Sequence, residues 1–429
     1  MARLAIIGGG ASGLIAACVA AELSHAYARD RSKDSPLDIV IYEATDKIGR
    51  PILRSGNGRC NLTNSAIDAS IYRNSQFVSQ ALAAASSLRV PLHLDDPAFQ
   101  YPQNIVACYF EQHGVALRKE AQGRIYPLTN KASTVLDALK SVIARFDVRV
   151  ELDSQIVSID EPTSDAGPIT LRGADGEFIR VDQVIDATGG TQSKGVLLPF
   201  VDHIERMPTL GPIATDNKLI KRLDSIRVRG EVSLASKDGT IKVKERGEVM
   251  FRKYGISGIA AFNISRFMEP GDVVSLDFLP QIPQDDITEF LLARSRHLES
   301  CMFCRPTNFD MLNGLVLPDV ADALLKFAHL DDKAPCSPAD FDALADALKS
   351  FMIECKGIGD AALCQVARGG YLMEGINAAT MSAKRSPRIH VTGESLDVDA
   401  PCGGYNLHWA FATGMLAAYD ALMQITKAG

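Results

Sequence analysis

A glycine-rich turn close to the N-terminus constrains the fold of this chain more than any other feature. An apolar stretch at residues 3–7 is typical of a short buried strand, and the sequence GGGASG follows it directly at residues 8–13. Alanine-rich, helix-forming sequence then continues to Leu23. A G-x-G-x-x-G turn that ends a strand and opens a helix predicts the start of a dinucleotide-binding βαβ unit.

The residues of this turn have distinct expected roles. Gly8 permits the tight turn, Gly10 lets the backbone approach a pyrophosphate, and Gly13 lets the helix pack closely on the strand. Ala11 and Ser12 begin the helix, where free backbone N–H groups can bind the anion. The alternative is a glycine-rich turn in an unrelated α/β protein.

An acidic residue ends the second predicted strand, at residues 39–42. Glu43 is placed to accept hydrogen bonds from an adenosine ribose. It lies 30 positions after Gly13, whereas about 20 is usual. The polar stretch at 24–38, ended by Pro36, is predicted to be a loop extension that accounts for the extra length.

The rest of the chain predicts an α/β layer structure interrupted by an insert. Helices are expected at 77–90 and 133–146, strands at 148–159 and 178–187, antiparallel β structure at 219–249, helices at 287–367, a strand at 389–392 and a last helix from Tyr405. The last two elements return to the first sheet. The predicted nucleotide-binding domain is therefore 1–192 with 365–429, and the insert is 193–364, β-rich at 193–283 and helical at 284–364.

Composition restricts the expected partners and compartment. The chain has 45 basic and 52 acidic residues, a net charge of -7, and no basic run, so a nucleic-acid partner is not expected. Nine scattered cysteines favour a reducing compartment, and we expect a cytoplasmic protein. No stretch reaches the roughly 18 apolar residues of a membrane span. The oligomeric state is not indicated.

NAD and FAD share the glycine turn, so three further segments bear on the choice of dinucleotide. Each supplies small, polar or charged residues that can wrap a diphosphate and a flavin or let a backbone approach them. They contain Arg50, Arg59, Cys60 and Asn61 in a long loop at 47–64, Thr188 and Gly189 after an apolar strand, and Gly393, Glu394 and Asp397 before the last helix. Together they favour FAD.

These segments resemble those of the YhiN/BaiN-like flavoproteins, FAD-dependent oxidoreductases related in fold to fumarate reductase flavoproteins. The similarity spans nearly the whole chain and is carried by residues 55–64, 123–132, 254–258, 380–384 and 393–410. It implies an α/β fold with a Rossmann-type FAD-binding domain of the glutathione-reductase-like superfamily and an inserted β plus α domain. The activities attached to the family include bile-acid-type enone reduction and aminoacetone oxidation.

The resemblance also implies roles for individual residues. Gly8, Gly10, Ser12, Gly13 and Glu43 would hold the ADP half, and Val157 would offer backbone contacts to the adenine. Arg59, Cys60 and Asn61 would lie near the flavin, Asp397 near the ribityl chain, and Gly404, Tyr405 and Asn406 at the pyrimidine edge. A helix N-terminus at that edge would stabilise the negative charge of the reduced flavin.

Other signals have competing interpretations. Lys253 and Tyr254 could donate a proton beside the flavin, but a surface lysine and a packed tyrosine are the favoured interpretation, and the family often has histidine at position 253. His408 and Trp409 fit packing and a catalytic role equally. Cys60 is either a redox partner of the flavin or a small packing residue. Cys301 and Cys304 lack further ligands, so no metal site is predicted.

We therefore predict an FAD-dependent oxidoreductase that transfers a hydride through flavin N5 to or from a small organic substrate. NAD(P)H is a candidate donor, although no separate domain for it is visible: the sequence GIGDAA at 357–362 follows a helical stretch and is interpreted as a helix stop and restart. Two alternatives are a flavin-dependent tRNA-modifying protein, which the net charge argues against, and a flavin-binding partner without turnover.

Overall fold

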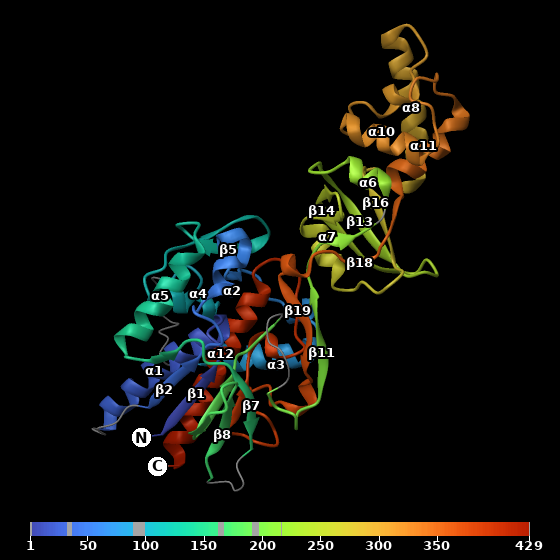
Figure 1. Cartoon of the computed structure of the whole chain (residues 1–429). Coiled ribbons are helices and arrows are strands. Elements are labelled where there is room, and N and C mark those ends of the chain that lie inside the picture. The colour runs from blue at the N-terminus through green and yellow to red at the C-terminus, as the bar shows by residue number, and fades with distance from the viewer. Residues whose placement is uncertain are drawn as a thin grey trace. The chain divides into compact units, whose positions relative to one another are not determined.

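The computed structural model describes residues 2–31, 37–88, 99–161, 167–190, 197–215 and 217–428 of the 429-residue chain. The chain forms two compact units. The first joins Met1–Met207 to Val366–Gly429, and the second is Pro208–Gln365. Each unit has its own continuous hydrophobic core, so each packs as a body in its own right (Figure 1).

A five-stranded parallel sheet forms the centre of the first unit, in the order β20-β10-β1-β2-β6. Its strands are β1 (Arg3–Ile7), β2 (Asp38–Tyr42), β6 (Arg149–Glu151), β10 (Gln183–Asp186) and β20 (Ile389–Val391). β10 and β20 are buried throughout, and β1 and β2 are buried except at their first residue. Continuous burial of this kind is typical of parallel strands covered on both faces.

Two helices, α1 (Ala11–Arg31) and α12 (Tyr405–Ala428), pack directly on this sheet. The other helices of the unit pack on these two or on each other, and they are α2 (Arg50–Arg54), α3 (Ser75–Ser86), α4 (Ile105–Gln112) and α5 (Ala132–Arg145). α1 and α12 run side by side (Figure 1), and residues 11–21 of α1 are all buried. The alanines at these positions let the two helices pack closely without large side chains between them.

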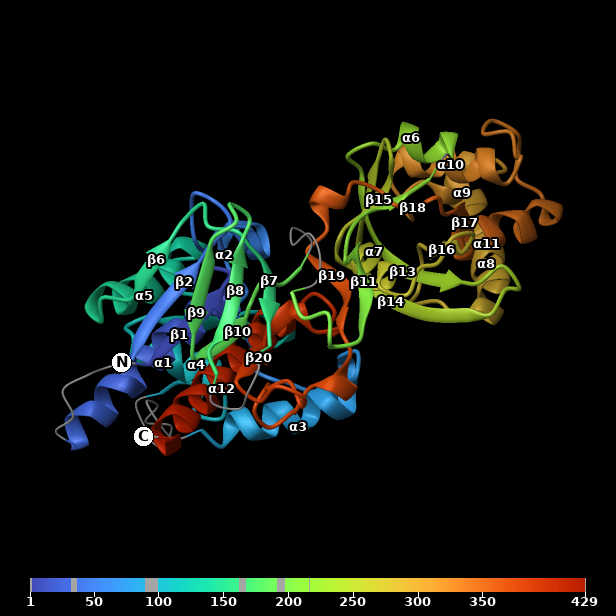
Figure 2. The same ribbon diagram turned by 60° about the horizontal axis from the view of Figure 1, so that its bottom comes forward.

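Smaller sheets extend the first unit. β3 (Thr63–Asn64), β5 (Arg124–Pro127) and β4 (Leu117–Lys119) form one, and β7 (Ile156–Asp160), β8 (Ile169–Gly173) and β9 (Phe178–Val181) form an antiparallel second one that touches β1 (Figure 2). β11 (His203–Thr209) pairs with β19 (Val366–Tyr371), and these two strands carry the chain out of the first unit and back.

The second unit consists of helices and an antiparallel sheet whose strands differ in length. Its strand order is β17-β16-β13-β14-β15-β12-β18, formed by β12 (Ile213–Ala214), β13 (Arg227–Ala235), β14 (Ile241–Arg252), β15 (Gly255–Ser257), β16 (Val273–Asp277), β17 (Phe351–Glu354) and β18 (Gly357–Ile358). Its helices are α6 (Lys218–Arg222), α7 (Ile259–Ser265), α8 (Ile287–Met302), α9 (Asn308–Leu312), α10 (Pro318–Phe327) and α11 (Phe341–Lys349). β13 and β14 pair as an antiparallel hairpin largely within the range predicted to be antiparallel β structure.

The loop extension predicted at 24–38 is wrong over its first part. α1 continues to Arg31, because the sequence after Leu23 contains helix-forming residues and no glycine or proline before Pro36. Ser24 lies within the helix, and its Oγ accepts the N–H of Leu37 at 2.7 Å. The proline itself lies outside the described residues. The long spacing between Gly13 and Glu43 therefore arises largely from a longer helix.

Two predictions at the ends of the insert are also corrected. The β structure predicted from Leu219 begins at Arg227, because residues 218–222 form α6. The helical stretch predicted to 367 ends at Lys349, after which β17 alternates buried and exposed residues against β16. The glycines at 357–359 do not restart a helix, since β18 pairs with β12. Cys301 lies in α8 but Cys304 lies beyond its end, and both are free and exposed.

Candidate functional site

The carboxyl ends of the parallel strands bring together four segments that are far apart in the sequence. The register pairs Ile7 with Tyr42 and with Asp186, and it pairs Asp186 with Val391. The chain therefore leaves the sheet side by side at Gly8, Glu43, residues 187–190 and residues 392–394, at the ends of β1, β2, β10 and β20. These four strands are labelled in Figure 2. Ligands of open α/β sheets bind at this edge, so we take it as the candidate site.

The three motif glycines of this turn, Gly8, Gly10 and Gly13, differ in the space around them. A Cβ on Gly8, whose φ is +106°, would lie 2.5 Å from the carbonyl oxygen of Ala187, and a Cβ on Gly13 would overlap the carbonyl of Gly8. A Cβ on Gly10 would meet only Pro51 Cγ, at 4.0 Å. The space beside Gly10 is therefore open, in front of the first N–H groups of α1.

Glu43 is held against this turn by three hydrogen bonds. Its Oε2 accepts the N–H of Gly9 at 2.8 Å, and its Oε1 accepts the N–H and the hydroxyl of Thr45 at 3.0 and 2.7 Å. The carboxylate is half-buried and is fixed beside the open face of the glycine turn. It can accept further hydrogen bonds there, because a carboxylate has about four lone-pair sites.

The end of β10 carries a buried carboxylate that sequence reasoning missed. Asp186 Oδ1 accepts the N–H and hydroxyl of Thr188 at 3.0 and 2.7 Å, and the hydroxyl of Ser395 lies 3.3 Å away. The N–H of Gly189 donates to Ser395 Oγ at 2.9 Å. Asp186 thus ties the two turns together. Its other oxygen is buried and has no hydrogen-bond partner among the described residues.

The turn before the last helix contains two further carboxylates. Glu394 accepts the N–H of Ala367, and burial raises the pKa of its carboxyl to about 7, against the opposing effects of that hydrogen bond and of Arg206. Asp397 accepts the N–H of Gly369 at 2.8 Å. Gly393 donates to Thr413 Oγ1 and accepts from the indole N–H of Trp409, so Trp409 has a packing role that orients this turn.

The polar loop at 55–64 returns to the same region. Arg59 lies over the ring of Tyr126, 4.4 Å from its centre, and pairs with Glu120 at 3.3 Å. Cys60 is fully buried with φ +57°, and burial raises the pKa of its thiol to about 12. A thiol in this state is a small packing residue, because the reactive form of cysteine is the thiolate.

Asn61 joins this loop to the start of α12. With the amide oriented by its neighbours, Asn61 accepts the N–H of Gly404 at 2.9 Å and donates to the carbonyl of Thr63 at 3.0 Å. Gly404 has φ +93°, and a Cβ there would overlap the same carbonyl. The N–H of Gly404 is therefore already used. The side chain of Asn406 folds back on the backbone of Ala400, at 2.9 and 2.8 Å.

The remaining predicted site residues lie at separate places. Arg50 begins α2 and pairs with Asp46. Val157 lies in β7 with its side chain 42% exposed. Tyr405 accepts a hydrogen bond from the Tyr72 hydroxyl through its carbonyl, at 2.9 Å. Lys253 and Tyr254 belong to the second unit, where the first is exposed and the second is half-buried.

The model of the HI0933-like protein Rossmann domain matches residues 2–420, which is nearly the whole chain. This chain belongs to the HI0933-like family. It is therefore an FAD-dependent oxidoreductase with a Rossmann-type FAD-binding domain, as the sequence predicts. The site suits that cofactor, since the open space beside Gly10 and the carboxylate of Glu43 match a pyrophosphate and a ribose.

Two curated relatives align with this HI0933-like protein over its full length. The 3-dehydro-bile acid delta(4,6)-reductase of Clostridium scindens is 31% identical over 98% of this chain and 99% of the relative. A ribosomal RNA dihydrouridine synthase of Escherichia coli K12 is 25% identical over 97% of both chains. Among solved structures, a flavocytochrome c3 fumarate reductase aligns over 98% of this chain and 78% of its own chain. The identity is 12% and the TM-score is 0.43.

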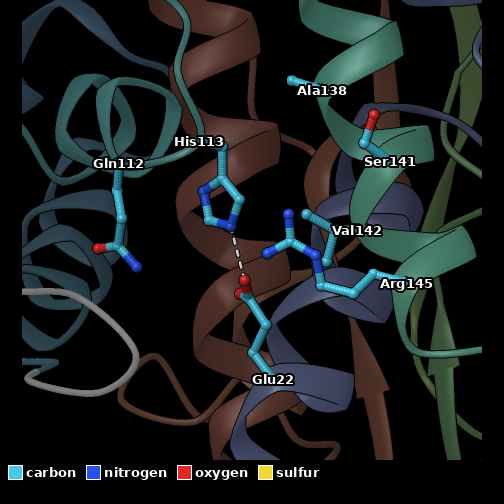
Figure 3. Close-up of a pocket in the computed structure, with 7 residues that line it drawn as sticks. All are labelled: Glu22, Gln112, His113, Ala138, Ser141, Val142 and Arg145. Carbon is cyan, nitrogen blue, oxygen red and sulfur yellow. Dashed lines mark hydrogen bonds and ion pairs between the residues drawn. The ribbon is translucent and has the colours of Figure 1, made fainter.

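A cavity of about 230 Å³ lies elsewhere in the first unit of this HI0933-like protein, among α1, α4 and α5 (Figure 3). In it, His113 Nε2 lies 2.6 Å from Glu22 Oε1, and His113 Nδ1 lies 2.7 Å from the carbonyl oxygen of Tyr109. Burial opposes the charged form, but these two acceptors raise the pKa of His113 above its usual value. Within the described ranges, no helix is long and apolar enough to cross a membrane.

Proposed function

We propose that this HI0933-like protein reduces a carbon–carbon double bond conjugated to a carbonyl group in a small, largely apolar molecule. The proposal rests on the reactions that the names of the two relatives describe. A delta(4,6)-reductase of a 3-dehydro-bile acid and a dihydrouridine synthase both remove such a double bond. The same change in two unlike substrates points to a shared reaction at the flavin.

The predicted site residues divide into two groups in this proposal. The first holds the ADP half of FAD and consists of Gly8, Gly10, Ala11, Ser12, Gly13, Glu43 and the backbone at Val157. The second lies along the flavin half and consists of Arg50, Arg59, Cys60, Asn61, Thr188, Gly189, Gly393, Glu394, Asp397, Gly404, Tyr405 and Asn406. The N–H groups that follow Gly404 in α12 would face the pyrimidine edge, because Asn61 already accepts the N–H of Gly404.

The reaction requires one hydride and one proton at the substrate. FAD, when bound and reduced, for example by a nicotinamide donor, would supply the hydride chemistry for the carbon β to the carbonyl. The protein must then exclude water, orient the double bond and stabilise the negative charge on the carbonyl oxygen. The proton for the α carbon would come from solvent or from an acidic side chain, for which the sequence offers Lys253 and Tyr254 as candidates.

The test is anaerobic reduction followed by reoxidation. The FAD-loaded protein is titrated with NADPH, NADH or dithionite and then mixed with cyclohex-2-enone, a 3-keto-4-ene steroid, or a uridine-containing RNA. Reoxidation of the flavin by an enone, with a product two mass units heavier, would support the proposal. Reoxidation by RNA alone would replace the small molecule with a nucleic-acid substrate. A flavin that no conjugated carbonyl reoxidises would contradict the proposal.

A further inference from the structure

A second cavity in the first unit adjoins the loop that runs beside Gly404. Its volume is about 540 Å³, within the usual range for small-molecule sites. Its walls come from α3, from the start of α4 and from residues 65–69, and they include Ala66, Ile67, Leu82 and Tyr101. The lining combines these apolar side chains with the polar side chains of Ser65, Gln103 and Asn104, and His408 of α12 contributes a ring that can form hydrogen bonds.

A chain of hydrogen bonds indicates which ring nitrogen of His408 carries the proton. Asn104 caps α4, with its Oδ1 accepting the N–H of Ala107, so its Nδ2 is a donor. That Nδ2 donates to Thr63 Oγ1 at 2.9 Å, and Thr63 Oγ1 lies 2.8 Å from His408 Nδ1. Thr63 is fully buried, and the described residues offer its O–H no acceptor except this nitrogen. His408 therefore accepts at Nδ1 and carries its proton on Nε2.

Burial keeps the imidazole of His408 uncharged. The side chain is 4% exposed, and desolvation lowers its pKa to about 3. Near neutral pH it is a neutral donor with one N–H, which is Nε2–H. No hydrogen-bond partner for Nε2 is present among the described residues, although this ring lines the cavity. A neutral N–H in a largely buried site suits a carbonyl oxygen rather than a carboxylate, because it brings no charge to offset that of the carboxylate.

Thr63 links this cavity to the flavin side of the site. Its carbonyl oxygen accepts from Asn61 and lies against Gly404, whereas its hydroxyl faces His408. His408 is also one helical turn after Gly404, and its N–H donates to the carbonyl of Gly404 at 3.0 Å. The residue that supports the predicted pyrimidine edge therefore also fixes the tautomer of the donor in the cavity.

We propose that this cavity binds an apolar molecule with a conjugated carbonyl group, and that His408 Nε2–H donates a hydrogen bond to the carbonyl oxygen. The inference rests on the proposed function for the class of ligand. A donor at this oxygen stabilises the negative charge that develops there when a hydride adds to the β carbon. The cavity supplies apolar contact to the rest of the molecule.

The experiment measures binding to the oxidised, FAD-loaded protein, so that it does not depend on turnover. Equilibrium dialysis compares a 3-keto-4-ene steroid with the same steroid carrying CH₂ in place of the carbonyl. His408→Phe should bind the ketone about tenfold more weakly, the size of one neutral hydrogen bond, and should bind the carbonyl-free steroid as wild type does. His408→Gln keeps an N–H donor and should recover most of the ketone affinity.

Two further measurements separate this role from a structural one. Ketone affinity in the wild type should stay constant from pH 5 to pH 8, since a histidine with an ordinary pKa would titrate in that range. Ser87→Ala is the control outside the cavity lining and should leave ketone affinity unchanged, because Ser87 Oγ already donates to the carbonyl of Ala84 at 2.6 Å. If His408→Phe fails to fold, Thr63→Val, which removes the donor to Nδ1, should weaken ketone binding more than binding of the carbonyl-free steroid.

The outcomes distinguish this inference from the proposed function. Equal ketone affinity in wild type and in a folded His408→Phe variant would overturn the inference, even if an enone reoxidises the reduced flavin. A His408→Phe variant that loses affinity for the ketone but keeps its affinity for the carbonyl-free steroid would support the inference. This holds even if no conjugated carbonyl reoxidises the flavin and the proposed function fails. Equal losses for the ketone and the carbonyl-free steroid would also overturn it, because they would indicate altered packing.

Discussion

At the scale of single residues, the three glycines at the fixed positions of the G-x-G-x-x-G motif are glycines for different reasons. Gly8 and Gly13 are required by the protein itself, since a side chain at either would meet backbone atoms. Gly10 is not, because a Cβ there would find space. Packing therefore does not require the absence of a side chain at Gly10, whereas the proposed contact with a pyrophosphate would.

We expect Gly10→Ala and Gly13→Ala to separate binding from folding. Gly10→Ala should keep the melting temperature of the FAD-free protein and weaken FAD binding at least about tenfold, because the methyl group takes space meant for the pyrophosphate. Gly13→Ala should lower the melting temperature of the FAD-free protein itself. Calorimetry and FAD fluorescence titration measure the two effects. Normal FAD affinity in Gly10→Ala would show that the pyrophosphate lies elsewhere.

His113 allows a test of pH dependence. Its pKa is raised in the folded protein, so its charged interaction with Glu22 stabilises the fold fully below the unfolded pKa of about 6.5. This contribution is lost as pH rises through the folded pKa. His113→Gln should therefore cost roughly 1–3 kcal/mol at pH 6 and less at pH 9, as measured by urea unfolding. A cost that does not change with pH would show that His113 is neutral throughout.

At the scale of elements, the start of α12 is built differently from the expectation. The sequence predicts that Gly404 offers its N–H to the flavin, but Asn61 accepts that N–H. A Gly404→Pro substitution would not test this end of the helix, because proline is incompatible with φ +93° and would disrupt the turn. The helix dipole is better tested by a charge at Asn61, which touches the first turn of the helix.

Asn61→Asp should lower the midpoint potential of the bound FAD. The new negative charge would offset the positive end of α12 and disfavour the reduced anion, by roughly 10–30 mV for a two-electron couple. Asn130→Asp, on an exposed loop, makes the same change of charge and should leave the potential unchanged. Spectroelectrochemical titration measures both variants. An equal potential in the two variants, each fully loaded with FAD, would place the flavin away from this helix.

At the scale of the whole molecule, the two units have separate cores and so should unfold separately. The only tryptophan of the chain, Trp409, is buried in the first unit, so its fluorescence reports on that unit alone, whereas far-UV circular dichroism reports on both. FAD should raise the midpoint of the fluorescence transition and leave a second, dichroism-only transition unchanged. A single transition that both probes share would show that the units unfold as one.

The sequence alone was enough to predict those features that depend on neighbouring residues. The strand, glycine turn and helix at residues 3–23 and the last helix from Tyr405 are carried by local patterns of apolar residues, glycines and helix formers. Local patterns gave wrong predictions for segments whose composition is compatible with more than one type of secondary structure. The polar stretch after Leu23 continues α1, and the segment after Lys349 becomes a strand because β16 offers it a partner.

Only the tertiary structure decided which polar groups are already used. Asn61 with Gly404, Asp186 with Ser395, and Thr63 with His408 are pairs separated by more than 200 positions in the chain, so no local pattern could reveal them. The glycine turn identifies a nucleotide site because its chemistry depends on backbone conformation at adjacent residues. The direction of a donor such as His408 depends on which distant side chain satisfies its other nitrogen, and the fold alone determines that.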